Sequence, residues 1–291
     1  MLKRLFFMFF LLGSFIFLVK AEKARGKKVE KHFVIFSAGR NHSKWVKKHL
    51  DSIFNQKYDN YEIIYIDDAS TDGSGELAAE YIKEKGMEHK VRLIINEERK
   101  YKMANQYHAI HEFCKDSDIV VEVDADDWLA NNNVLSSLNK IYSNSNIWLT
   151  YGKYRNYPSG KPGYSRDIPK RVRRRNGIRR FPYAFAGLRT FYAGLFKLIK
   201  KEDLYYQGKD EEFRGKFTPI TSDGSIMYPM LEMCQKGHYR FIKKVMHITN
   251  RKVSLPTKYS KRMLSIRKEV ENRIKKMKKY PALDKPLWEI S

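Results

Sequence analysis

The 291-residue sequence contains only two cysteines, Cys114 and Cys234, which excludes a disulfide scaffold and a four-cysteine zinc site. It contains neither G-x-G-x-x-G nor G-x-x-x-x-G-K-[ST], so neither a dinucleotide-binding loop nor a P-loop is supported. Acidic residues are few: 33 Asp and Glu stand against 57 Lys and Arg, giving a net charge of +24. This excess indicates an anionic partner, which could be nucleic acid, an acidic membrane surface or a phosphorylated substrate.

The N-terminal apolar run, 5–19, is shorter than the ~20 residues of a standard transmembrane helix. Lys3 and Arg4 precede it and the small residue Ala21 follows it, a pattern typical of a signal peptide. We therefore predict a signal peptide, or alternatively a short signal-anchor, over 1–21. Residues 22–31 are charged and read as a linker. The protein would be exported or enter the secretory route, and would stay membrane-associated if 1–21 is not cleaved.

The hydrophobic pattern after residue 32 alternates between strand and helix. Hydrophobic residues make up 42% of the sequence and aromatic residues 14%, enough for a sizeable core. Apolar runs predict five strands, and positions at helical spacing between them predict four helices. The predicted strands are 33–36, 61–66, 91–95, 119–123 and 147–151. Such alternation predicts an α/β fold with a mostly parallel, Rossmann-like sheet and helices on both faces.

The fourth predicted strand ends in a cluster of carboxylates. Asp124, Asp126 and Asp127 follow the apolar run 119–123 directly. In an open α/β sheet, ligands bind at this end of the strands. Three carboxylates within four residues repel one another unless a cation holds them. Mg²⁺ or Mn²⁺ on a substrate diphosphate would serve, because these ions take one or two carboxylates plus phosphate oxygens. The alternative is an acidic turn that caps the next helix.

The second predicted strand also ends in acids, Asp67 and Asp68. An acid at this place commonly accepts hydrogen bonds from a ribose, although a turn with a helix cap would use the same residues. Two acidic strand ends on one edge of a sheet would face one crevice. Acids at two strand ends in one crevice argue against a protein that binds polyanions there.

In this order, the segments resemble family 2 glycosyltransferases of the GT-A fold, which transfer sugars from nucleoside diphosphates. The resemblance covers 32–151 closely and is weaker beyond. The matching segments are Val34 to Asn41, Leu50-Asp51-Ser52-Ile53-Phe54-Asn55-Gln56, Ile66-Asp67-Asp68-Ala69-Ser70-Thr71-Asp72-Gly73-Ser74, Asn96 with Arg99 to Asn105, and Asp124-Ala125-Asp126-Asp127.

The resemblance implies roles for these residues. The donor nucleotide and sugar would be bound in one crevice, and a divalent cation, Mn²⁺ or Mg²⁺, would be held on the diphosphate by Asp126 with Asp127. Asp67 would hydrogen-bond the base and Asp124 would contact the ribose or the donor sugar. The donor-binding set that the resemblance implies is Ala38, Arg40, Asp67, Asp68, Arg99, Asn105 and Asp124.

The family resemblance also implies one catalytic base, because most of its members invert the anomeric centre. Asp223 lies at the expected separation past the D-x-D and begins a helix-like stretch. Ser222 stands where the family often has Glu, and a helix-capping carboxylate is the alternative. Asp210, Glu211 and Glu212 are rival bases.

The family implies a nucleotide-sugar donor, most commonly UDP-linked, and a glycan, lipid-linked or protein hydroxyl as acceptor. The Q-x-x-R-W motif of the family's processive members is absent, which argues against a polysaccharide synthase.

The second half of the sequence is rich in basic residues. We expect 32–151 to be the nucleotide-sugar-binding half, 152–256 the acceptor and base half, and 257–291 a basic amphipathic tail. The basic stretch 153–182 reads as a loop and 189–199 as an amphipathic helix, from which Arg189 could reach a phosphate. A helix over 258–280 could lie on a membrane surface or close the domain. His238 or His247 could add a metal ligand, although a structural role fits either.

These basic segments support one alternative function: a membrane- or nucleic-acid-binding module on a catalytically degenerate transferase-like fold. The acids at two strand ends argue against it, and the predicted targeting segment makes a nucleic-acid partner the less favoured of the two.

Overall fold

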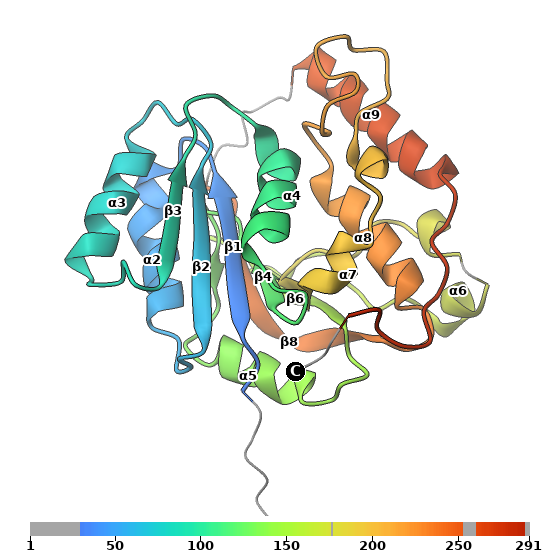
Figure 1. The fold of residues 1–291 in the computed structure, drawn as a ribbon, viewed down its shortest axis with the longest axis horizontal. Helices are drawn as coiled ribbons and strands as arrows, with labels where there is room; N and C mark the ends of the chain where they lie inside the picture. The colour runs from blue at the N-terminus through green and yellow to red at the C-terminus, as the bar shows by residue number, and fades with distance from the viewer. Residues whose placement is uncertain (1–29, 176, 253–259, 289–291) are drawn as a thin grey trace, which may run out of the picture. The chain divides into compact units, whose positions relative to one another are not determined.

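An eight-stranded sheet organises the part of the chain that the structure, a computed structural model, describes: residues 30–175, 177–252 and 260–288. Its strand order is β3-β2-β1-β4-β7-β6-β8-β5 (Figure 1). The strands are β1 (Phe33–Gly39), β2 (Tyr61–Asp67), β3 (Val91–Ile95), β4 (Ile119–Glu122), β5 (Trp128–Leu129), β6 (Leu149–Tyr157), β7 (Arg189–Tyr192) and β8 (Tyr239–Asn250).

Helices join these strands and cover the sheet. The α-helices are α2 (Val46–Phe54), α3 (Ser74–Glu84), α4 (Tyr101–Phe113), α5 (Val134–Tyr142), α6 (Lys170–Arg174), α7 (Ala193–Lys197), α8 (Ser222–Met233) and α9 (Lys261–Lys276). The 3-10 turns are η1 (Ser43–Trp45), η2 (Ile178–Arg180) and η3 (Lys201–Leu204). In the described ranges, no helix is long and apolar enough to cross a membrane. The targeting segment predicted for 1–21, and the predicted linker up to residue 29, lie outside them.

The parallel half of the sheet has the predicted form, with helices on both faces. Strands β3, β2, β1 and β4 are parallel neighbours. The chain steps outward from β1 to β2 and β3, then returns past β1 to β4. Because such crossovers are right-handed, α2 and α3 lie on one face and α4 on the other, as Figure 1 shows. The reversal of direction makes the gap between β1 and β4 a switch point, where α/β sheets bind ligands.

The predicted acidic strand ends meet at this switch point. Gly39 at the end of β1 pairs with Asp67 at the end of β2. Past the end of β4, the Ala125 N–H donates to the Ala38 carbonyl at 3.4 Å. A Cβ on Gly39 would lie 2.8 Å from the Ala125 Cβ, so this close approach requires glycine.

The helix predicted over 189–199 is wrong in its first part. Residues 189–192 form β7, which pairs antiparallel with β4 and with β6, and the helix α7 begins only at Ala193. All four residues of β7 are buried. A strand buried on both faces has no polar alternation, so its apolar pattern could not be told from a buried helix. Thr190, Phe191 and Tyr192 are β-branched or aromatic, which favours the strand.

The basic stretch 153–182 is more ordered than the predicted loop. Its first residues extend β6 to Tyr157, and α6 and η2 follow. The predicted C-terminal helix is present as α9, and Ile266, Val270 and Ile274 are buried on its inner face. Helix α9 packs against α8 and η2, so its apolar face closes the body.

Candidate active site

The loop after β2 is held by hydrogen bonds to two of its carboxylates, Asp67 and Asp72. The Asp67 carboxylate, 1% exposed, accepts hydrogen bonds from the Ser70 N–H at 2.9 Å and the Ser70 hydroxyl at 2.5 Å. Asp72 accepts from the Ser43 N–H at 3.0 Å, and this contact joins the loop to the turn after β1. Burial opposes it, but hydrogen bonds from Ser74 and Ser43 lower the Asp72 pKa to about 2. Asp67 therefore lies at the predicted edge of the crevice in a fixed orientation.

Asp68 is held by the start of α4, and its predicted contact with the donor stays a prediction. Its Oδ1 accepts from the Asn96 side chain at 3.0 Å, the Asn105 side chain at 2.9 Å and the Lys100 N–H at 2.9 Å. Its Oδ2 accepts from the Tyr101 N–H at 2.9 Å. Asp68 thus accepts four hydrogen bonds, three on Oδ1 and one on Oδ2. Asp68 and the buried Asn105 thus fix the start of α4.

Three further predicted donor residues lie around this loop. Ala38, the next-to-last residue of β1, is 9% exposed. Arg40 is exposed, and its Nε donates to the Ala69 carbonyl at 3.0 Å, so it bridges the loops after β1 and β2. The Arg99 guanidinium lies 4.2 Å from the centre of the Tyr101 ring, on the α4 side. Of these three residues, Arg40 is the one whose side chain bridges the loops after β1 and β2.

Lys102, on α4, joins three carboxylates at the end of β4. Its Nζ lies 2.7 Å from Glu122 Oε1, 2.6 Å from Asp124 Oδ1 and 3.2 Å from Asp223 Oδ1. Burial alone would lower the Lys102 pKa, but these three negative charges outweigh it and hold the pKa well above its usual value. Asp124 and Asp223, far apart in the sequence, therefore face each other across one ammonium group.

Arg189 binds the same cluster from β7. Its Nε lies 2.8 Å from Glu122 Oε2 and its Nη2 lies 3.2 Å from Asp223 Oδ1. Glu122 is fully buried between the two cations. Burial would raise its pKa, but Arg189 and Lys102 lower it far below the usual range. Arg189 thus anchors Glu122 and Asp223, and the contact with a phosphate that the sequence allowed stays a prediction.

Asp223 lies in the first turn of α8 with one carboxylate oxygen uncommitted. Both of its cation contacts use Oδ1. The side chain is 36% exposed and lines a cavity of about 710 Å³. Lys102 and Arg189 thus fix Oδ1, and within the described ranges Oδ2 forms no ion pair.

Asp126 is the carboxylate of the D-x-D-D segment that fits a cation. It has no side-chain partner in the described ranges, unlike Asp124 and Asp127. Burial, and then the charges of Asp127 and Asp124, raise the Asp126 pKa to about 7. A carboxylate in such a place lacks positive charge, which a bound divalent cation would supply.

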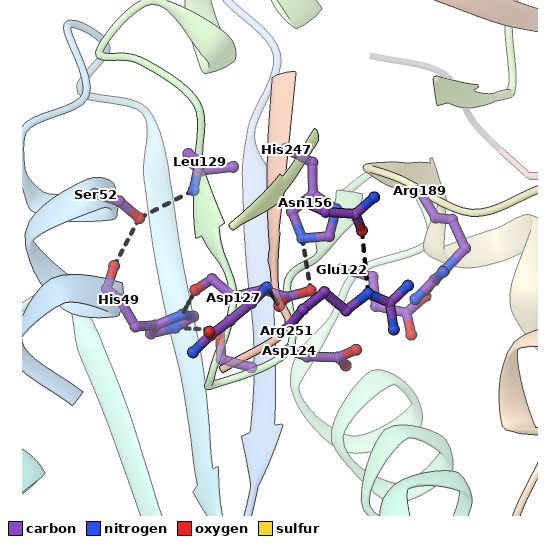
Figure 2. Close-up of polar contacts among 12 residues, drawn as sticks. His49, Ser52, Glu122, Asp124, Asp127, Leu129, Asn156, Arg189, His247 and Arg251 are labelled. Carbon is purple, nitrogen blue, oxygen red and sulfur yellow. Dashed lines mark hydrogen bonds and ion pairs between the residues drawn. The ribbon is translucent and has the colours of Figure 1, made fainter. Parts of the chain in front are cut away.

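Asp127 is held by the fold, and its predicted role as a metal ligand stays a prediction. It is buried, its Oδ1 accepts from the Asn250 N–H at 2.7 Å, and its Oδ2 lies 3.0 Å from His247 Nε2. The His49 ring donates to the Asp127 carbonyl at 2.7 Å. Figure 2 shows Asp127 between His49 and His247. The loop is therefore clamped between α2 and β8, which leaves Asp126 as its free acid.

Two of the rival bases, Asp210 and Glu212, and the candidate ligand His238 contact residues other than Lys102, Arg189 and Asp127. Asp210 and Glu212 form ion pairs with Arg262 at 2.6 Å each. His238 stacks on Trp148, with ring centres 3.5 Å apart. In the described part of the chain, no group of three or more His, Cys, Asp and Glu is arranged to hold a metal ion. A cation here would rely on Asp126 and on donor phosphate oxygens.

Backbone strain gathers around the same crevice. Among described residues other than glycine, four have left-handed φ angles, between 56° and 64°: Asn41, Ala69, Tyr101 and Thr221. They lie after β1, after β2, at the start of α4 and before α8. Such residues cost about 1–3 kcal/mol each and cluster at functional sites.

Sequence reasoning missed Lys102 and Glu122. Glu122 interrupts an otherwise apolar strand, and a buried glutamate needs cationic partners. A glutamate within an apolar strand therefore predicts a cationic partner, but it does not show which residue that is. Lys102 lay inside the segment 99–105 that carried the resemblance, but only the fold shows which carboxylates it meets.

Comparisons with known proteins show the family and the fold. Residues 35–204, more than half of the chain, match the family profile described as Glycosyl transferase family 2. The curated protein Glycosyltransferase GlyA of Streptococcus pneumoniae serotype 4 is 34% identical over 101 residues, which are 35% of this chain. The chain spans only 14% of the length of that relative.

Solved structures resemble the fold at low sequence identity. S. aureus TarS 1–349 in complex with UDP has a TM-score of 0.55 at 14% identity, over 85% of this chain and 67% of that one. Mannosyltransferase PcManGT from Pyrobaculum calidifontis, in complex with GDP-Man and Mn²⁺, has a TM-score of 0.51 at 17% identity, over 77% and 57%.

The fold is that of a GT-A glycosyltransferase, with acids from several loops around the switch point. The chain belongs to glycosyl transferase family 2.

Proposed function

We propose that this chain is an inverting, divalent-metal-dependent and non-processive glycosyltransferase. It moves a sugar from a nucleoside diphosphate, with a UDP-sugar as the first candidate donor, to a hydroxyl acceptor. Two neighbours in fold support the donor class, because they were solved with UDP-GlcNAc and with GDP-Man and Mn²⁺.

One observation carries the proposal: Lys102 joins Asp124 to Asp223 within 3.2 Å of each. Asp124 belongs to the donor-side loop and Asp223 to the start of α8. Asp124 on the donor side and Asp223 as the base would then lie on either side of the anomeric carbon. Catalysis by orientation needs groups held at that spacing.

The reaction balances as a single displacement. The acceptor oxygen forms a bond to the anomeric carbon while the bond from that carbon to the diphosphate oxygen breaks. The acceptor proton passes to Asp223 Oδ2, and the nucleoside diphosphate leaves with the electron pair. Lys102 and Arg189 hold the other oxygen of Asp223, which keeps the base aimed at the cavity.

Asp126 would hold the cation. When bound, a divalent ion offsets the negative charge that develops on the departing diphosphate. Burial of Asp126 beside Asp127 and Asp124 favours such an ion over an unpaired charge. Asp67, fixed by Ser70, lies at the nucleotide side of the crevice.

Calorimetric titration of the full chain with UDP, GDP and CDP, with and without Mn²⁺, tests the donor site. We expect one nucleotide to bind, only with the metal, and Asp126→Ala to abolish that binding. Asp59→Ala, an exposed acid on another face, is the control and should bind as the wild type does. A folded protein that binds none of the nucleotides would contradict the proposal and favour a non-catalytic module.

A second measurement separates binding from chemistry. Asp223→Asn should retain nucleotide affinity but lose transfer by about 10²–10⁴-fold, the usual contribution of a general base. Unchanged turnover in this variant would exclude Asp223 as the base. Export or membrane association, expected from residues 1–21, stays a prediction of the sequence.

A further inference from the structure

A large cavity opens beside the proposed base, away from the donor loops. Its volume is about 710 Å³, within the range of small-molecule sites. Asp223 and Thr221 form its edge at the start of α8, and α9 provides another wall. Aromatic side chains line it as well: Tyr164, Phe181, Tyr183 and Tyr228. An acceptor in this cavity would present its hydroxyl to Asp223.

The cavity lining carries more positive than negative charge. Five basic residues line it, against the acids Asp223 and Glu271. Two of the five are neutralised, because Arg179 binds Glu232 at 2.7 Å and Arg267 binds Glu271 at 2.8 Å. The remaining three, Arg180, Arg251 and Lys275, are exposed and form no ion pair within the described ranges.

Arg251 is already oriented. Its Nε donates to the Asn156 side chain at 3.0 Å, a contact visible in Figure 2. The other guanidinium nitrogens stay available, in the planar fork that matches a phosphate group. Arg180 follows the buried Arg179, whose pairing with Glu232 fixes the local backbone.

Two hydroxyl groups of the lining, Tyr183 Oη and Thr221 Oγ1, are buried and have no hydrogen-bond partner among the described residues. Buried polar groups in native proteins nearly always have partners, so an orphan group needs an explanation. A polar ligand in the cavity would provide one.

We propose that this cavity binds an acceptor that carries a phosphate group close to its reacting hydroxyl. The inference rests on the proposed function and names the acceptor class of that same site. A phosphate carries between one and two negative charges at pH 7 and accepts several hydrogen bonds. Arg180, Arg251 and Lys275 bind its oxygens, the orphan hydroxyls donate to it, and the aromatic rings cover the sugar or polyol.

The test compares matched probes on the full chain by calorimetry, in the presence of Mn²⁺ and the nucleotide that binds. Glucose 6-phosphate and glycerol 3-phosphate carry the phosphate, and glucose lacks it. We expect both phosphates to bind and glucose to bind at least tenfold more weakly. Arg180→Gln with Arg251→Gln should weaken phosphate binding at least tenfold and leave nucleotide affinity unchanged.

Lys243→Gln with Lys244→Gln is the charge-matched control, because both lysines are exposed on β8 and neither lines the cavity. Tyr183→Phe adds an independent readout. It should weaken phosphate binding without lowering the melting temperature, because the lost hydroxyl has no partner in the free protein.

Vesicle flotation identifies the source of the phosphate. Binding to phosphatidylglycerol vesicles that is lost in Arg180→Gln with Arg251→Gln, but kept in the control pair, indicates a lipid-linked acceptor. Phosphate binding without such flotation indicates a soluble one. Glucose binding as tightly as the phosphates, or an equal loss in both double variants, overturns the inference. Nucleotide binding without phosphate binding overturns it alone, whereas failure of all nucleotides overturns the proposed function as well.

Discussion

Glu122 shows how one buried residue ties the two sides of the crevice together. It lies in the strand β4, fully buried, within 2.8 Å of both Lys102 and Arg189. A buried carboxylate is stable only while such cations remain. Lys102 and Arg189 also contact Asp223. Glu122 therefore holds the two cations that position the proposed base.

Lys102→Met should lower the free energy of unfolding by about 3 kcal/mol at pH 7, because removing one partner leaves buried charge uncompensated. Pairing holds the Glu122 pKa below its ordinary 4.5, so this stabilisation is present above about pH 4.5 and is lost as the pH falls through the folded-state pKa. Urea unfolding of wild type and variant should therefore converge in acid. Lys140→Met, exposed on α5, is the control and should stay within about 0.5 kcal/mol. An equal effect in both variants would contradict the pairing.

Asp126→Asn should stabilise the metal-free protein at pH 8. The folded-state pKa of about 7 lies above the ordinary 3.8, so ionising this carboxyl costs stability as the pH rises from about 4 to above 7. At about 1.4 kcal/mol per pKa unit, the gain is on the order of 4 kcal/mol at pH 8 and vanishes near pH 3.5.

Thermal unfolding in EDTA measures this gain, with the exposed Asp59→Asn as the matched control. Addition of Mn²⁺ and nucleotide should then stabilise only the wild type. A variant that gains no stability at pH 8 would show that Asp126 is not an isolated buried charge.

At the scale of elements, the start of α8 carries both strain and function. Thr221 has φ 64° and ψ 26°, and the next two residues open the helix with Asp223 in its first turn. The Thr221 hydroxyl is also buried without a partner. The turn is therefore costly, and it directs Asp223 toward Lys102 and Arg189.

Thr221→Gly should raise the free energy of unfolding by about 1 kcal/mol, because it removes left-handed strain and an orphan hydroxyl. Transfer should fall, because the looser turn positions Asp223 less well. Thr249→Gly, on the strand β8, is the control and should lose stability instead. Differential scanning calorimetry with a turnover assay measures both. Loss of stability in Thr221→Gly would exclude strain at this turn.

At the scale of the whole molecule, the basic C-terminal helix is part of the folded body. Ile266 is 1% exposed and faces inward, whereas Leu264 on the same helix is 49% exposed. The apolar face of α9 is thus occupied by α8 and η2. Its basic face stays available to the cavity that we assign to the acceptor.

Ile266→Ala should cost about 2–4 kcal/mol, as for other large-to-small changes in a core. Leu264→Ala, a matched change on the exposed face, should stay within about 0.5 kcal/mol. Chemical denaturation of both variants measures the difference. If both variants were neutral, α9 would not be packed on the body and the cavity would lose a wall.

The sequence alone determined the parallel half of the fold and the location of the acids. The strand ends at Asp67 and Asp124 follow from local hydrophobic runs, and a parallel sheet brings such ends to one edge. The family resemblance, and not this pattern, pointed to Asp223, which begins a helix-like stretch that the structure shows as α8.

Only the tertiary structure decided which of these acids are held by distant parts of the chain. Asp68 and Asp127 have the same sequence signal as their neighbours, yet distant backbone N–H groups occupy their oxygens. The convergence of Lys102 and Arg189 on Asp223 depends on the placement of β7 beside β4, and the buried pattern of β7 reads equally as helix. Electrostatic partners separated by many residues are chosen by packing, and a one-dimensional pattern does not contain that information.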